Sequence, residues 1–209
     1  RRMGVKKLKV GHAGTLDPLA TGVMIVCTGK ATKRIEEFQG HTKEYVATLR
    51  LGATTPSYDL EHGIDATYPT GHITRELVED VLRRFTGTIE QVPPAFSACM
   101  VEGKRAYELA RKGEEVELKP KRLVIDEIEL LDCCLDGPEP AIRIRVVCSK
   151  GTYIRALARD IGEALHSGAH LTGLVRTRVG DVRLEDCLDP EGFKEWIDRQ
   201  EIENDEDNN

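Results

Sequence analysis

The chain has 209 residues, of which 40% are hydrophobic, and a formal net charge of −6. No apolar run approaches the roughly 20 residues needed to cross a membrane, and we find no secretory signal, so we expect a cytoplasmic protein with no membrane partner. The length suits one large domain or two small ones.

Charge is distributed unevenly along the chain. Residues 1–34 contain eight Lys or Arg and one acid, whereas residues 180–209 contain three Lys or Arg and twelve acids. This asymmetry predicts a basic working surface and a separate acidic end, although a basic block can also be an ordinary solvated face. Residues 201–209 have almost no apolar side chains after Ile202, and we expect them to form a disordered acidic tail.

The six cysteines form no Cys-x-x-Cys pair, which disfavours a zinc site. We expect them to be reduced and to serve mostly as small hydrophobic side chains, as in other cytoplasmic proteins. They are Cys27, Cys99, Cys133, Cys134, Cys148 and Cys187.

In the first half of the chain, the pattern predicts a buried strand over residues 22–28 and a helix over 31–38. Residues 43–51 alternate, as expected for a half-buried strand that places Tyr45 on its apolar face. A loop-rich stretch over 54–71 precedes a helix that Thr74 can cap and that ends before Gly87. A short helix is predicted over 104–112.

The second half predicts strands over 123–131 and 141–148, joined through Asp136-Gly137-Pro138. A helix follows over 153–166, then a last strand or strand pair over 171–184 and a terminal helix over 193–197. There is no internal repeat. Because strands and helices mix without strict alternation, the pattern favours an α+β fold over a doubly wound sheet.

The segment Gly11-His12-Ala13-Gly14-Thr15-Leu16-Asp17-Pro18-Leu19-Ala20-Thr21-Gly22 presents a single carboxylate, Asp17, in a loop rich in turn-forming residues. Glycines allow tight turns and close approach of a ligand, and Pro18 disfavours helical geometry at Asp17. A turn with a solvated aspartate has the same composition. A P-loop is excluded because the glycines are not followed by Lys-Ser or Lys-Thr at the required spacing. A phosphotransferase or hydrolase would commonly need a second carboxylate nearby for Mg²⁺, and the next acid along the chain is Glu36.

This segment resembles the active-site signature of TruB-type tRNA pseudouridine synthases. The similarity runs from Lys9 through Gly22, continues in Thr28-Gly29-Lys30-Ala31-Thr32-Lys33, and extends from about Lys6 to about Arg178. Three later segments agree in order: Lys43-Glu44-Tyr45, Lys104-Arg105-Ala106-Tyr107-Glu108-Leu109-Ala110 and Cys148-Ser149-Lys150-Gly151-Thr152-Tyr153-Ile154-Arg155. The resemblance implies the pseudouridine synthase fold, a mixed and mostly antiparallel sheet with flanking helices and a central cleft.

The resemblance also implies a reaction, the conversion of a uridine at position 55 in the T loop of tRNA to pseudouridine, without a cofactor or metal. Asp17 matches the family's catalytic aspartate, which can add to the sugar or the base or stabilise charge as the base detaches. Arg155 matches the active-site arginine. Without the resemblance, Arg155 would be interpreted as a solvated residue on a helix face.

Tyr45 matches an active-site tyrosine whose ring can stack on the base and whose hydroxyl is a candidate proton acceptor. Tyr153 matches a second tyrosine that contacts the substrate, and Leu174 an apolar residue of the uracil pocket. His12 matches the histidine that takes the place of flipped T-loop bases, since a stacked base must be extruded to be reached.

Lys104 and Tyr107 match a motif near the catalytic cleft. We expect Lys104, together with Lys9, Lys30 and Lys33, to bind RNA. The family normally opens with a strand that carries Asp-Lys-Pro, and that strand is missing before Arg1. A C-terminal PUA domain is also expected to be absent.

We therefore expect a monomer with a catalytic domain over residues 1–200 that binds the T arm of tRNA. The alternative is a protein on the same scaffold that binds or folds RNA without turnover. An intact Asp17 with Tyr45 and Arg155 favours the enzyme.

Overall fold

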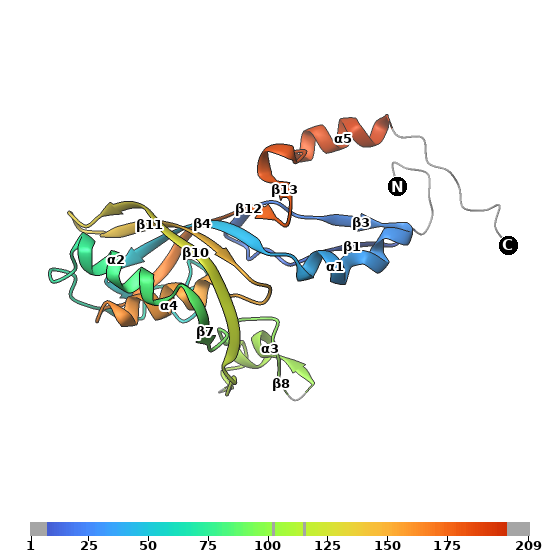
Figure 1. The fold of residues 1–209 in the computed structure, drawn as a ribbon. Coiled ribbons are helices and arrows are strands. Elements are labelled where there is room, and N and C mark those ends of the chain that lie inside the picture. Colours follow the sequence, from blue (N-terminus) through green and yellow to red (C-terminus); the bar gives the residue numbers. More distant parts are fainter. Residues whose placement is uncertain (1–7, 102, 115, 200–209) are drawn as a thin grey trace, which may run out of the picture.

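The computed structural model describes residues 8–101, 103–114 and 116–199, and its centre is a seven-stranded sheet (Figure 1). Six strands follow the order β13-β12-β4-β11-β10-β7 with antiparallel neighbours, and β2 pairs in parallel with β12. Their bounds are β2 Ala20–Gly22, β4 Lys43–Leu51, β7 Gly87–Gln91, β10 Lys121–Cys134, β11 Ala141–Cys148, β12 Ala169–Val179 and β13 Val182–Arg183. The predicted α+β class and mostly antiparallel sheet are confirmed.

Helices α2 (Arg75–Arg84) and α4 (Ile154–Ala164) supply the side chains that cover one face of the sheet. Thr74 caps α2 as predicted, accepting a hydrogen bond from the backbone N–H of Leu77 at 3.2 Å. Helix α4 lies very close to β12, because a Cβ on Gly162 would approach the backbone nitrogen of Ala169 to 2.4 Å. The core between helices and sheet is a single cluster.

The opposite face of the sheet is polar. Arg145 on β11 forms ion pairs with Glu44 on β4 and with Glu127 and Glu129 on β10. This difference between the two faces follows from the alternation of apolar and charged residues in β4 and β11.

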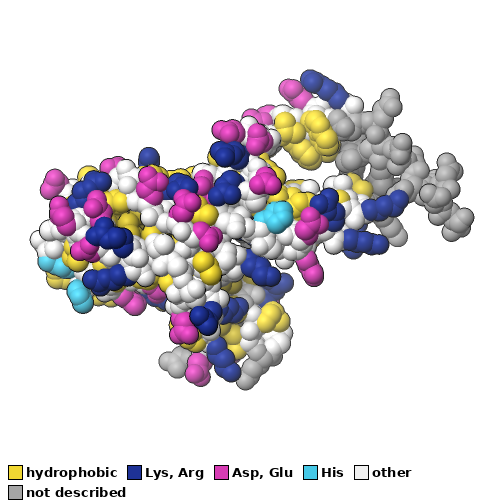
Figure 2. Space-filling view, in the orientation of Figure 1, with side chains coloured by type: hydrophobic (Ala, Val, Ile, Leu, Met, Phe, Trp, Pro, Cys, Tyr) yellow, Lys and Arg dark blue, Asp and Glu magenta, His cyan; other side chains and the backbone are white. Residues whose placement is uncertain are grey.

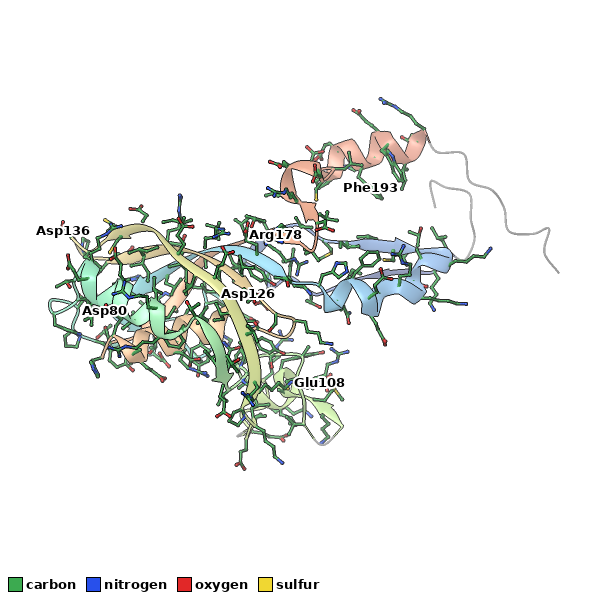
Figure 3. All side chains as sticks on the ribbon, in the orientation of Figure 1. Asp80, Glu108, Asp126, Asp136, Arg178 and Phe193 are labelled. Carbon is green, nitrogen blue, oxygen red and sulfur yellow. The ribbon has the colours of Figure 1, made fainter. Side chains whose placement is uncertain are left out.

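Two parts of the molecule project from the sheet (Figure 1). The first, which we call the arm, is the hairpin of β1 (Val10–His12) and β3 (Val26–Thr28) with the 3₁₀ helix η1 (Gly29–Arg34) and α1 (Ile35–Gly40). The second, which we call the lobe, contains β8 (Met100–Val101), β9 (Lys104–Arg105) and α3 (Ala106–Ala110). Figure 3 labels Glu108 of α3 in the lobe, apart from the arm.

The remaining elements are short or peripheral. They are the pair β5 (Ala53–Thr54) and β6 (Ala66–Thr67), the 3₁₀ helix η2 (Leu184–Asp186) and the terminal helix α5 (Pro190–Asp198). The predicted tail over 201–209 lies outside the described residues.

The prediction of one buried strand over residues 22–28 is wrong. The segment leaves β2 at Gly22 and forms β3 only from Val26, where the burial alternates instead of being continuous. The physical reason lies at Gly22, which has φ +110° and packs so tightly on Arg176 that a Cβ would overlap its backbone. The chain therefore turns out of the sheet and into the arm.

Candidate active site

A cavity of about 890 Å³ opens where the apolar face of the sheet extends beyond α4. Its size falls within the 300–1,000 Å³ typical of sites for small ligands. The loop after β1, strands β4 and β12, the start of α4 and the lobe all contribute to its walls. Its polar and aromatic lining includes Asp17, Lys43, Tyr45, Arg105, Tyr107, Lys150, Tyr153, Arg155 and Arg176.

Asp17 lies in the irregular segment between β1 and β2. Gly14 turns the chain with φ +103°, and the backbone N–H of Ala20 donates to the Asp17 carbonyl at 2.8 Å, which closes a tight turn around Pro18. Buried Ala13 anchors the start of the segment by donating its N–H to the Ile25 carbonyl at 2.9 Å. The loop therefore presents one carboxylate from a fixed backbone, as its sequence predicts.

Arg155 and Asp17 form a bidentate ion pair. Nε and Nη2 of Arg155 donate to the two carboxylate oxygens of Asp17, each at 2.9 Å. The arginine side chain is 5% exposed and the aspartate side chain 32% exposed, so the pair has one buried and one accessible partner. The interpretation of Arg155 as a solvated helix residue is therefore wrong.

The guanidinium of Arg155 has two further partners in the segment after β5. Its Nη1 donates to the Ser57 carbonyl at 3.2 Å, and its Nε lies 3.7 Å from the carboxylate of Asp59, which is almost fully buried. Asp59 is a second carboxylate that reasoning along the chain missed, since it is 42 positions from Asp17 in sequence. Contacts of this kind become visible only when the fold brings the segments together.

Gln91 fixes the start of α4, which carries Arg155. Its side-chain amide accepts from the Tyr153 N–H at 3.0 Å and donates to the Tyr153 carbonyl at 3.2 Å, in the manner of a neighbouring strand. Before this point, Gly151 turns the chain with φ +82°, and the hydroxyl of Thr152 donates to the Ser149 carbonyl at 2.9 Å.

Tyr45, Tyr153 and Leu174 all line the cavity, as the resemblance implies. Tyr45 on β4 pairs with Arg176 on β12, so these side chains lie on the same face of the sheet. Burial raises the pKa of the Tyr45 hydroxyl, and the Arg176 charge opposes that shift. The hydroxyl is therefore protonated at neutral pH.

The cavity also contains two buried cations that the sequence analysis did not identify, Lys43 and Arg176. Lys43 donates from Nζ to the carbonyls of Gln39 and His41 at 2.5 and 2.6 Å, and burial lowers its pKa. The available signal was spacing, since Lys43 lies two positions before Tyr45 and Arg176 two after Leu174, each on the same side of its strand.

The remaining predicted residues lie outside the cavity. His12 is exposed on β1 and is not among the lining residues. Lys9, Lys30 and Lys33 are exposed on the arm, and Lys104 is exposed on β9 of the lobe. Figure 2 shows Lys and Arg side chains on both the arm and the lobe, whereas both signs mix over the body.

Within the described ranges, no group of three or more His, Cys, Asp or Glu side chains could hold a metal ion. The helices in the same ranges are all too short or too polar to cross a membrane.

The sequence matches two family models that meet within this site. The model for the TruB family pseudouridylate synthase N-terminal domain matches residues 1–154, and the model for the tRNA pseudouridylate synthase B C-terminal domain matches residues 155–207. The chain belongs to the TruB family of pseudouridylate synthases. It is therefore a member of an isomerase family. The boundary between the two models falls in front of Arg155, whereas β4 and β12, from the two matched segments, are neighbours in one sheet.

Curated relatives extend the same similarity over nearly the whole chain. The tRNA pseudouridine synthase B of Bacteroides thetaiotaomicron is 90% identical over 209 residues, which are the full chain and 87% of that protein. The enzyme of the same name from Bacteroides fragilis is 81% identical over 97% of this chain and 85% of its own length. The relative from Francisella philomiragia is 46% identical over 93% of this chain and 63% of its own length.

Solved structures agree on the fold. A chain of a Cbf5-Nop10-Gar1 complex superposes with a TM-score of 0.60 at 30% identity, covering 84% of this chain and 41% of that one. A chain of an H/ACA RNP bound to a substrate RNA containing 2'-deoxyuridine gives a TM-score of 0.56 at 28% identity, with 84% and 40% covered.

Proposed function

We propose that this enzyme converts the uridine at position 55 in the T loop of tRNA to pseudouridine, with Asp17 as its catalytic carboxylate. The observation that carries the proposal is the bidentate pair of Asp17 with Arg155 in a cavity large enough for a flipped nucleotide. The curated relatives named tRNA pseudouridine synthase B support the choice of tRNA as substrate.

The reaction is an isomerisation and needs no atoms from a co-reactant. The C1′–N1 bond breaks, the base turns, and a C1′–C5 bond forms, while C5 loses a proton and N1 gains one. Asp17 adds to the sugar or the base, or stabilises the charge that develops as the bond breaks. Arg155 keeps this carboxylate ionised and aims it into the cavity through two parallel hydrogen bonds.

Three other side chains hold the base. Tyr45 offers its ring for stacking and its hydroxyl for proton transfer, although that hydroxyl must first ionise. Tyr153 and Leu174 line the remaining walls of the base site. Extruding the uridine leaves a gap in the stacked loop, and His12 is the residue we assign to that gap.

The rest of the tRNA is bound by the arm and the lobe. Exposed lysines on these two parts lie on either side of the cavity along the chain, at Lys9, Lys30 and Lys33 before it and Lys104 after it. Their charges attract phosphates without reading sequence.

The decisive experiment replaces Asp17 by Asn, which keeps the size and polarity of the side chain but removes its charge. We expect pseudouridine formation on unmodified tRNA, followed by tritium release from labelled uridine, to fall below detection. Binding of tRNA and thermal unfolding should stay near those of the unaltered protein.

The alternative of an RNA-binding or RNA-folding protein makes the opposite prediction. In that case the unaltered protein binds tRNA without tritium release, and Asp17→Asn changes nothing. Turnover by Asp17→Asn at the unaltered rate would rule out Asp17 as the catalytic group.

A further inference from the structure

Arg176 is the largest fully buried side chain of the molecule, with 1% of its surface exposed, and it lies at the floor of the cavity. It extends from β12 on the same face as Leu174. A guanidinium in such a place needs partners for its five N–H groups, since burying an unpaired charge is very costly.

The partners of Arg176 are backbone carbonyls of the catalytic loop. Its Nη2 donates to the Gly14 carbonyl at 3.2 Å and its Nη1 approaches the Thr15 carbonyl at 3.5 Å, both before Asp17. Its Nε donates to the Val23 carbonyl at 2.7 Å, after Asp17.

The backbone of Arg176 holds the same loop a second time. Its carbonyl accepts from the Val23 N–H at 2.8 Å, and Gly22 lies opposite it in the parallel pairing of β2 with β12. Residues 14–23 therefore form a closed loop whose two ends meet at one residue, with Asp17 between them.

The charge of Arg176 is not used in an ion pair with any carboxylate in the described part of the chain, and carbonyl oxygens take up its N–H groups instead. Only a planar fork can reach carbonyls at both ends of the loop at once, whereas a lysine would offer one compact ammonium.

We propose that Arg176 is a positioning residue, whose guanidinium fixes both ends of the loop 14–23 and thereby places Asp17 for reaction. The role rests on the proposed catalytic function of Asp17. Misplacement of a catalytic group by about 1 Å can cost on the order of 100-fold in rate.

The test compares Arg176→Lys with Arg159→Lys. Arg159 is a matched control, because it also donates to a backbone carbonyl, that of Val92 at 3.0 Å, but does not line the cavity. For each variant we would measure the single-turnover rate, the Kd for tRNA and amide hydrogen exchange in peptides covering residues 13–23.

We expect Arg176→Lys to lower the single-turnover rate by on the order of 100-fold, with the Kd for tRNA changed less than threefold, and to speed exchange in the loop peptide. Arg159→Lys should leave the rate and the loop exchange unchanged. Unchanged exchange in Arg176→Lys, or faster exchange with an unchanged rate, would overturn the proposal.

A second variant protects the test against a general loss of folding. Arg176→Ala leaves a space that free guanidinium ion can enter, so millimolar guanidinium should restore part of its single-turnover rate but none of that of Asp17→Asn. Absence of rescue in a folded Arg176→Ala protein would count against the proposal, and if this variant does not fold, Arg176→Lys decides. An active Asp17→Asn enzyme would defeat the proposed function itself, whereas the exchange measurement on Arg176→Lys reports on the loop alone.

Discussion

At the scale of single residues, the sequence identifies the groups that face the substrate better than the groups that hold them. Asp17, Tyr45 and Arg155 fall within recognisable motifs, and all three line one cavity. Asp59 and Arg176 act through contacts with distant segments, so no local pattern predicts them. Their partners are a side chain and backbone carbonyls that only the folded chain brings within reach.

The raised pKa of Tyr45 leads to a prediction about proton transfer. Tyr45→Phe keeps the ring that can stack on the base but removes the hydroxyl, so we expect the single-turnover rate to fall by about 100-fold or more and the Kd for tRNA to change little. Because burial favours the protonated hydroxyl, the rate of the unaltered enzyme should rise with pH above neutrality, and this rise should be lost in Tyr45→Phe. A variant that kept the full rate would leave Tyr45 with a stacking role only.

Cys148, at the end of β11, predicts a specific loss of stability in alkali. Burial raises the pKa of its thiol from 9.0 to about 11, so the folded state holds this proton longer than the unfolded state. The contribution is present in full below pH 9 and is lost as pH rises through 11, amounting to about 1 kcal/mol at pH 10.

We therefore expect the free energy of unfolding in urea to fall by about 1 kcal/mol more between pH 8 and pH 10 in the unaltered protein than in Cys148→Ala. Cys134→Ala, at an exposed cysteine, is the control and should behave like the unaltered protein. Equal pH dependence in Cys148→Ala would show that this thiol does not stay protonated in the folded state.

At the scale of elements, hydrophobic periodicity predicted the main body well. Strand β4 and the buried stripes of α2 and α4 lie where the pattern places them, because each buries one face against the sheet. Prediction failed between Gly22 and Thr28, where close contact with Arg176 overrides the apolar pattern. Tertiary contact, not local preference, decides the conformation there.

The link between β7 and α4 predicts a stability effect coupled to activity. Gln91→Leu removes the amide that binds both backbone groups of Tyr153 and leaves them buried without a partner, at a cost of about 1–3 kcal/mol for each group. Since these groups begin the helix that carries Arg155, we expect the single-turnover rate to fall as well.

Thr74→Ala is the matched control for Gln91→Leu. It removes the cap of α2 and should cost about 1 kcal/mol in the free energy of unfolding. Its single-turnover rate should be unchanged because α2 does not line the cavity. If Gln91→Leu lost stability but kept its full rate, the start of α4 would not need this clasp for catalysis.

At the scale of the whole molecule, net charge and local charge point in different directions. The chain is acidic overall, yet the arm carries exposed lysines and the acidic residues concentrate from Asp181 onward, including α5. Figure 1 shows α5 and the arm as separate projections, and Figure 3 labels Phe193 on α5. A polyanionic substrate can therefore be attracted at the arm although the molecule as a whole is negative.

This arrangement predicts that tRNA binding depends on salt through the arm. Each phosphate contact by Lys or Arg releases counterions and contributes a slope of about −0.7 to −0.9 to log K against log salt concentration. If Lys9 and Lys33 each contact one phosphate, the double variant Lys9→Glu, Lys33→Glu should reduce the slope by about 1.5. Neutralising two acids of α5, with Glu191→Gln and Glu195→Gln, should leave the slope almost unchanged. The measurement is the Kd for unmodified tRNA across a salt series for the unaltered protein and both double variants. A flat response of the unaltered protein, or equal effects of the two double variants, would mean that the lysines of the arm are solvated surface residues, and that tRNA is held by the cavity and the lobe.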